Sequence, residues 1–579
     1  MAVALTLARM KIAVLRHSHK GAWGSMTSTG VFLGLLFSGG TLYLAATADA
    51  ELLAGVYAVW MMGWILGPVV MGGGDETLKP EHFALLGLKS HRLATGLLVA
   101  AFVGLAPLIS LTALLGLAVA GVRHAGPAGV LPAVPAIVLQ LALFVLLSKV
   151  AVGVLGLALR SRLGAVGAGV VNGAVLAGGS QIWVFLALFD QSGVPEAVWY
   201  LPSGWGLLAV RGDLAALAGL AVLDLLLLAA WAALLARSAG APRTSGRPRR
   251  PIRAASANGA VVAKELRTWS RDLARNHQLV FALSFAVCFG ASPLLIGWDG
   301  MLPSAGPIFV VMAAGLTSNL YGTDGTALWL TMLTPGATDV RGRQRAWLAV
   351  IAPVAGVVTV GSTAVAGGQW PLVLALLPAL LGGAAGLVPL LSVYGLVPGT
   401  DPHKRSGNPL RVSDDNGGLT GLAYLMLALV VVTGVPAGLA ALRYGWAGVA
   451  VGLATGALCY WGLGLMAERR LRGQGPELLH AMRTGRRTGK AAASRLAALP
   501  KPQQAIAWVG FGFGSIPLFP QGIVASIFIV NDIERHSWFL ATYMSPSLRW
   551  PVVIAMVLLG LTMYGMALYQ VSRASPRRA

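Results

Sequence analysis

Charged residues and cysteines are scarce in this sequence. Only 11% of the 579 residues are charged and two are cysteines, whereas 56% are hydrophobic and the mean hydropathy is +0.73. Cys288 and Cys459 both lie in apolar runs, which excludes a disulfide framework and a cysteine metal site. A soluble chain of this length could not bury so much apolar surface, and many runs reach the roughly 20 residues that cross a bilayer. The composition therefore predicts an all-α polytopic protein embedded in the lipid bilayer.

Acidic residues are about half as frequent as basic ones, 21 against 43, which gives a net charge of +22. The bases cluster beside the apolar runs, chiefly between Arg237 and Arg275 and between Arg469 and Lys501. Cytoplasmic segments next to membrane spans are rich in Lys and Arg, so both clusters are expected in the cytoplasm, near anionic lipid. This distribution explains the charge without nucleic acid, which we do not expect as a partner.

The apolar runs predict fourteen spans. They lie near 28–48, 52–72, 93–120, 131–159, 164–189, 214–236, 277–297, 305–321, 346–366, 370–395, 419–440, 445–466, 505–530 and 551–570. An even number of spans places both termini in the cytoplasm, and residues 1–27 contain no convincing cleavable signal peptide. We therefore expect a multi-pass protein of the cell (plasma) membrane.

Six spans, a basic linker and six further spans indicate a parallel duplication, because an even number of crossings restores the orientation of the chain. We predict two six-helix transmembrane repeats plus a C-terminal two-helix hairpin. The predicted regions are a first six-span half with an N-terminal interfacial helix (1–236), a flexible basic linker (237–260), a second six-span half (261–466), a basic cytoplasmic segment (467–504) and an accessory hairpin with a basic tail (505–579).

A similar loop follows the second span of each half, over 72–87 and 321–343. Each loop opens with glycine, an acid and a threonine, continues with a partly apolar stretch and closes on a base before the next span, Arg92 for the first loop and Arg341 and Arg343 for the second. Asp75 and Asp324 are placed to cap a short helix that presents an apolar face at the cytoplasmic surface. Such a face suits a protein partner or, alternatively, an anchor at the membrane interface. The candidate docking residues are Asp75, Glu76, Phe83, Leu86, Asp324, Trp329, Met332, Arg341 and Arg343.

A basic amphipathic helix is expected before the first span of each half, within 1–27 and over 261–272. We call these two segments the pre-span helices; for 1–27 the alternative is a disordered basic tail. In the second helix the bases are expected to face water, and Leu266 and Trp269 are expected to face lipid. The candidate residues of the pre-span helices are Lys11, Arg16, Lys264, Glu265, Arg267 and Trp269.

Four segments resemble actinobacterial permease subunits of type-2 ATP-binding-cassette exporters. They are DETLKPEHFALL at 75–86, KELRTWSRD at 264–272, GTDGTALWL with the following TP and DVRGR at 322–343, and RRLRGQGPELL at 469–479. The resemblance covers about residues 1–485, and the C-terminal hairpin departs from the family pattern. It implies that two six-span halves form an export path for an amphipathic or hydrophobic compound such as a drug or antibiotic.

The resemblance also implies the partners. Cytoplasmic ATPase subunits, either two copies or two different chains, would bind the pre-span helices and the two loops, and would carry the ATP and Mg²⁺. No cofactor is expected in this chain, because its nearest phosphate-loop pattern, Gly485 to Ala491, is one residue short and lacks the Ser or Thr after Lys490. No catalytic constellation or metal-ligand spacing accompanies the nine histidines, so we expect a transport component and not an enzyme.

Two ionisable residues interrupt apolar spans: Lys149 in the fourth and Asp224 in the sixth. Such residues are costly in lipid and are candidates for function. They could form a pair that fixes the two spans, or a polar site or proton relay on the substrate path. The second possibility would make the protein an ion-coupled secondary transporter. A non-transporting membrane scaffold is a third hypothesis, and it leaves the repeated loops unexplained.

The segment 195–205 lies between the fifth and sixth spans on the predicted outer side, and its prolines and aromatics cannot continue a spanning helix. In the resembled exporters, short re-entrant helices close the exit at this place. Trp199, Pro202 and Trp205 are therefore candidates for an outer gate. The alternative is an interfacial aromatic belt.

Overall fold

The computed structural model describes most of the chain. The described residues are 2–18, 22–70, 83, 90–158, 161–239, 252–329, 339–398, 418–484, 499–530 and 539–573. They form helices and turns without a strand, and eleven helical stretches are long and apolar enough to cross a membrane. One of these, Leu105–Ala158, contains two successive helices. The described part of the chain is therefore an all-α, multi-pass membrane protein.

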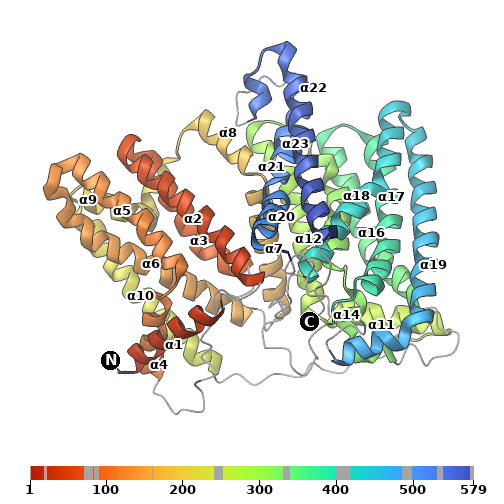
Figure 1. Cartoon of the computed structure of the whole chain (residues 1–579), viewed down its shortest axis with the longest axis horizontal. Helices are drawn as coiled ribbons and strands as arrows, with labels where there is room; N and C mark the ends of the chain where they lie inside the picture. The colour runs from red at the N-terminus through yellow and green to blue at the C-terminus, as the bar shows by residue number, and fades with distance from the viewer. Residues whose placement is uncertain are drawn as a thin grey trace.

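Residues 2–239 make up what we call the first half. Its elements are α1 (Ala2–Ser18), α2 (Ala22–Thr47), α3 (Ala50–Val70), α4 (Ser90–Ala101), α5 (Leu105–Ala125), η2 (Gly126–Gly129), α6 (Val130–Ala158), α7 (Arg162–Ser180), α8 (Ile182–Ser192), η3 (Glu196–Tyr200), α9 (Pro202–Val210) and α10 (Leu214–Ala239). Helices α1 and α4 lie at one end of the molecule, and α8 and α9 lie at the other (Figure 1).

The second half comprises residues 252–484. Its elements are α11 (Ala257–Arg271), α12 (Leu273–Ala291), η4 (Ser292–Ile296), η5 (Leu302–Ser304), α13 (Ala305–Leu316), α14 (Leu320–Asp324), η6 (Gly325–Ala327), α16 (Asp339–Ala366), α17 (Trp370–Tyr394), α18 (Gly418–Tyr444) and α19 (Ala447–Thr484). The C-terminal hairpin follows, with α20 (Lys501–Phe513), α21 (Ser515–Leu518), the π-helical η8 (Phe519–Val524), α22 (Ala525–Val530), η9 (Leu540–Tyr543) and α23 (Pro546–Arg573).

Three of the predicted spans in the two halves are interrupted, the run 505–530 is divided among α20, α21, η8 and α22, and α19 extends past the predicted end at 466 to Thr484. The run 93–120 is divided, because Gly104 is extended and Pro107 lacks the N–H that would continue α4; the span begins at Leu105. The run 164–189 breaks at Gln181 between α7 and α8. The run 305–321 contains only the short α13, which is followed by a turn and α14.

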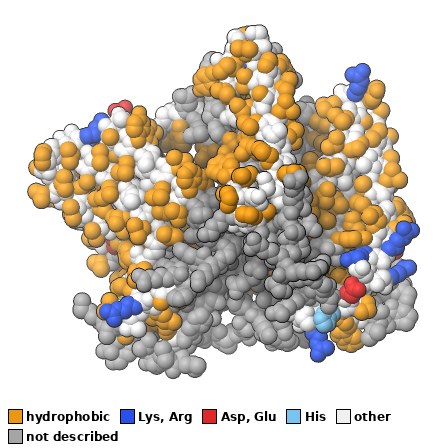
Figure 2. Space-filling view, viewed as in Figure 1, with side chains coloured by type: hydrophobic (Ala, Val, Ile, Leu, Met, Phe, Trp, Pro, Cys, Tyr) orange, Lys and Arg blue, Asp and Glu red, His pale blue; other side chains and the backbone are white. Residues whose placement is uncertain are grey.

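The two halves stand side by side, with the hairpin in front of the gap between their ribbons (Figure 1). They meet where α7 packs along α12. Gly169 and Gly173 of α7 lie against the α12 backbone, and Ser284 Oγ donates a hydrogen bond to the Val170 carbonyl oxygen at 2.8 Å. Small residues permit this close approach of two helices in lipid. Hydrophobic side chains cover the flanks of the visible face, and charged side chains gather toward its two ends (Figure 2).

Candidate functional site

Six charged side chains meet at the end of the second half that carries α11, and we call them the six-charge cluster. They are Lys264 and Glu265 of α11, Arg275 of α12, Asp324 of α14, and Asp339 and Arg343 of α16. Three bases face three acids, so the cluster is neutral overall. Residues from four helices are joined here, although they are up to 79 positions apart in the sequence.

Arg343 is the centre of the cluster, and its side chain is completely buried. Its Nε donates to Asp339 Oδ2 at 2.7 Å, its Nη1 lies 3.0 Å from Glu265 Oε1, and its Nη2 donates to Asp324. The guanidinium carbon also lies 4.2 Å from the centroid of the Tyr321 ring. A buried cation is tolerated when it has such partners, and the aromatic face adds a cation–π attraction.

Glu265 connects α11 to the neighbouring helices. Its Oε2 accepts a hydrogen bond from Arg275 Nη1 at 2.8 Å, and its Oε1 faces Arg343. Lys264 extends the cluster to the surface, because its Nζ donates to Asp324 Oδ2 at 2.7 Å while its side chain is 40% exposed. Helix α11 is thus bound through ion pairs to α12, α14 and α16.

Burial alone would raise the pKa values of Asp324 and Glu265, but the neighbouring cations outweigh the effect of burial. Arg343 and Lys264 hold the pKa of Asp324 below its usual range. Arg343 and Arg275 lower the pKa of Glu265 in the same way. Both groups are therefore ionised at neutral pH, and the cluster is held by charged pairs.

The predicted orientation of the second pre-span helix is wrong for Trp269, which is buried and does not face lipid. Val261, Glu265 and Trp269 recur every four residues and form one buried face of α11. This face packs on α16, where Gly342 allows Val261 to approach closely. The attraction of Glu265 to the buried arginines turns this face inward, and Leu266 and Arg267 are half-buried beside it.

The second loop differs from its prediction at Asp324. This side chain makes no capping hydrogen bond to a helix, because its carboxylate is bound to Arg343 and Lys264. Arg343 is enclosed and has no exposed surface to offer a partner. Arg341 instead pairs with Glu468 of α19 at 3.3 Å and stacks over Trp461. Leu328 is buried, whereas the next residue, Trp329, is 47% exposed.

The first half has a related arrangement. Helix α1 packs on α4, as α11 packs on α16. Phe83, predicted to be an exposed docking residue, is buried against Leu7 of α1, Leu97 of α4 and Trp231 of α10 because these apolar side chains enclose it. Lys11 is buried as well and does not lie on the surface of the helix. The predicted residues Asp75, Glu76, Leu86 and Met332, and the side chain of Arg16, lie outside the described part of the chain.

Among the described residues no ion pair joins Lys149 to Asp224, and both carboxylate oxygens of Asp224 lack a hydrogen-bond partner. Gln140 of α6 bonds to α9, Trp205 of α9 packs on Gly219 of α10, and farther along Gly153 of α6 lies against Leu234. Helices α6 and α10 therefore run in the same direction. Lys149 precedes Gly153 by fewer residues than Asp224 precedes Leu234, and the difference is about six residues. Along the shared direction of α6 and α10, Lys149 is therefore roughly 9 Å beyond the level of Asp224. This difference in level explains why the predicted pair is not formed.

The candidate outer-gate residues lie on η3 and α9. Trp199 is half-buried beneath Arg211, whose guanidinium carbon is 5.7 Å from the ring centroid. The Pro202 carbonyl accepts a hydrogen bond from Gln140 Nε2 at 3.2 Å, and Trp205 packs on α10. The short α9 is thus held among α3, α5, α6 and α10, and its role as a gate stays a prediction.

Sequence reasoning missed an aromatic cluster that joins both halves to the hairpin. Trp183 of α8 lies 6.2 Å from Trp298, 5.5 Å from Phe528 and 5.7 Å from Phe539, measured between ring centroids. Trp298 follows η4, and the two phenylalanines belong to or precede elements of the hairpin. The sequence feature that could have indicated this cluster is the presence of aromatic residues near the ends of three apolar runs. The hairpin therefore packs on the junction of the two halves, at the end opposite the six-charge cluster.

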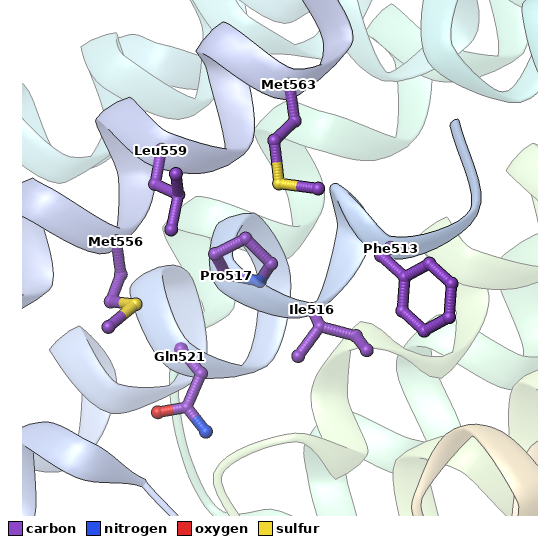
Figure 3. Close-up of a pocket in the computed structure, with 7 residues that line it drawn as sticks. All are labelled: Phe513, Ile516, Pro517, Gln521, Met556, Leu559 and Met563. Atoms are coloured by element: carbon purple, nitrogen blue, oxygen red, sulfur yellow. The ribbon is translucent and has the colours of Figure 1, made fainter. Parts of the chain in front are cut away.

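An open cavity of about 330 Å³ lies on the hairpin (Figure 3). It is lined by Phe513, Ile516, Pro517, Gln521, Met556, Leu559 and Met563. Gln521 is its one polar lining residue, and its Oε1 accepts a hydrogen bond from the Leu540 N–H at 2.8 Å. All of the lining residues belong to the hairpin, so this cavity is separate from the interface between α7 and α12.

The fold defines an all-α protein that crosses the membrane many times, with a buried ion cluster at one end and an aromatic junction at the other. Comparisons of the chain with protein-family models, with curated proteins and with solved structures find no match.

Proposed function

We propose that the chain is the permease of an ATP-driven exporter of amphipathic or hydrophobic compounds, with the ATPase on separate cytoplasmic subunits. The observation that carries the proposal is the recurrence of one local assembly at the same end of both halves. In the first half the pre-span helix packs on α4, which precedes the third span, and in the second half it packs on α16, which is itself the third span. In each half an apolar residue of the intervening loop is buried nearby. Two such assemblies suit two docking subunits.

The six-charge cluster supplies the mechanical link in the second half. Ion pairs join α11 to α12 and α16, the first and third helices of the proposed second repeat. A force applied to α11 would therefore move these helices with it as a rigid body, the usual mode of domain motion in transporters. Breaking a buried pair is costly, which keeps the connection intact during such a movement.

Trp329 provides the proposed contact surface. Leu328 is 1% exposed and anchors the segment, whereas Trp329 presents a large apolar ring outside the spans. Exposed tryptophans beside charged residues are characteristic of partner sites. Under this proposal the basic linkers and both termini lie in the cytoplasm, as the charge distribution predicts.

The test uses Trp329→Asp and the matched control Trp446→Asp. Trp446 is 63% exposed and lies in the short connection between α18 and α19. This connection is at the end of the molecule opposite α11 (Figure 1). The full-length chain is purified from its native membrane in mild detergent, and the amount of bound ATPase subunit and the ATP hydrolysis rate are measured. We expect Trp329→Asp to weaken ATPase binding by about 2 kcal/mol or more and Trp446→Asp to leave it unchanged. Equal binding by wild type and Trp329→Asp, or no ATPase bound to the wild type, contradicts the proposal.

A further inference from the structure

Asp224 is a buried carboxyl group without a hydrogen-bond partner inside a predicted membrane span. Its side chain is 8% exposed, and both Oδ atoms are enclosed and make no hydrogen bond in the described structure. The following residues, Leu225 and Leu226, are 65% and 62% exposed and point away from the half. Asp224 therefore faces the interior of the first half, while its neighbours in sequence face lipid.

The carboxyl group lies between two apolar clusters. On one side, Leu217 of α10 packs against an apolar cluster that includes Ala136 and Ile137 of α6. On the other side, Leu228 and Trp231 of α10 belong to a cluster with α1, α4 and Phe83. These clusters separate Asp224 from both ends of the helix, so water reaches the group only if α10 and α6 move apart.

Few charges face Asp224 from the surrounding helices. Among the helices packed on α10, α9 contains no titratable residue, and the one charged residue of α6 is Lys149, roughly 9 Å farther along. Helix α4 contributes His91 and Arg92, whose side chains lie outside the described part of the chain. On α10 itself the nearest base is Arg237, which is 13 residues or about 20 Å away.

Among the described side chains, an ionised carboxylate at this place would have neither solvation nor an adjacent counter-charge. Placing an acid at the centre of a membrane helix costs on the order of 3 kcal/mol even when the helix can adjust, and more when no partner compensates it. The neutral acid avoids this cost. We propose that Asp224 is a proton-binding site of the membrane domain, which holds a proton in the closed arrangement of α6 and α10 and releases it to water when they separate.

This inference goes beyond the proposed export function and does not depend on an ATPase partner. Release breaks the carboxyl O–H bond, transfers the proton to water and leaves a carboxylate. Rebinding reverses the step, so no other reactant is required. The ligand is the proton, and the site gives the membrane domain a means of responding to pH.

Carbodiimide labelling tests the proposal on the full-length protein in lipid nanodiscs. Dicyclohexylcarbodiimide is apolar and reacts with protonated carboxyl groups: the acid O–H adds across a C=N bond, and the adduct rearranges to a stable N-acylurea. Peptide mass spectrometry should find the adduct on Asp224 at about pH 7, with labelling falling at least tenfold by about pH 10 as the proton is lost. Glu477, an exposed acid outside the predicted spans, should stay unlabelled. Absence of the adduct from Asp224 at every pH overturns the proposal.

The variant Asp224→Asn gives an independent test. Asn has nearly the same shape and is neutral, so it replaces a neutral acid with little loss of stability. We expect the thermal midpoint of the variant at neutral pH to stay within a few degrees of the wild type. A large decrease would mean that the native group is an ionised, paired carboxylate, and it would contradict proton binding.

Discussion

Glu265 shows how a single acid can hold several helices together. One carboxylate oxygen contacts Arg275, and the other contacts both Arg343 and Lys264. Removal of its charge would leave two buried guanidinium groups with fewer counter-charges. An uncompensated buried charge costs about 3 to 5 kcal/mol, far more than a surface pair contributes.

We therefore expect Glu265→Gln to destabilise the protein by about 3 kcal/mol at neutral pH, measured by thermal unfolding in detergent. Glu477→Gln, at an exposed site on α19, should change the stability by less than about 0.5 kcal/mol. Because the folded protein lowers the pKa of Glu265, its contribution is complete above the unfolded value of about 4 and is lost as the pH falls below it. The difference between wild type and variant should shrink in acid; a pH-independent difference would show that the charge is not responsible.

The sequence shows which charged residues are important, but it does not show whether they are buried or exposed. Lys264, Glu265, Asp324 and Arg343 belong to two separate sequence motifs, and the structure brings them into contact. Their burial could not be predicted, because an amphipathic pattern does not distinguish a helix that faces lipid from one that faces another helix. Trp269 illustrates this ambiguity.

At the scale of elements, the packing of α17 on α19 depends on glycine. A Cβ at Gly456 would lie 2.2 Å from the Pro378 carbonyl oxygen, and one at Gly452 would lie 2.1 Å from that of Ala375. The two backbones are therefore in direct contact, which is the usual means of helix association in lipid.

Gly456→Ala should force α17 and α19 apart and cost about 1 to 3 kcal/mol. Gly462→Ala is the control on the same helix, since a Cβ at Gly462 meets no atom within 4 Å. The measurement is the thermal midpoint of each variant in detergent. Equal midpoints for the two variants would contradict the close packing.

Periodicity and hydropathy predict the position of most apolar helices but not their interruptions. The run 93–120 has one continuous apolar character, yet α4 leaves the line of α5 and packs on α1. This arrangement depends on the contacts of α4 with other helices, and a hydropathy average over one segment does not include such contacts. The same reasoning applies to α7 and α8, whose separation at Gln181 is stabilised by a hydrogen bond from its side chain to the Phe289 carbonyl at 3.1 Å.

At the scale of the whole molecule, the two ends differ in whether their side-chain clusters join the halves. The six-charge cluster confines its links to the second half, whereas the aromatic cluster at the opposite end connects α8, the end of η4 and the hairpin. The sequence indicated the hairpin as an addition but not its position, because aromatic residues at span ends equally suit the membrane interface. Under the proposed function, each half would carry its own docking region, and the aromatic cluster would join the halves at the opposite end.

The most direct test of this account is the composition of the native complex. Native mass spectrometry of the full-length protein, purified with its partners from the membrane, measures how many ATPase subunits bind to one 59.8 kDa chain. Two docking regions in one polypeptide predict one chain with two ATPase subunits, either identical or different. A chain that carries a single ATPase subunit, or none under conditions that preserve lipid binding, would contradict the account.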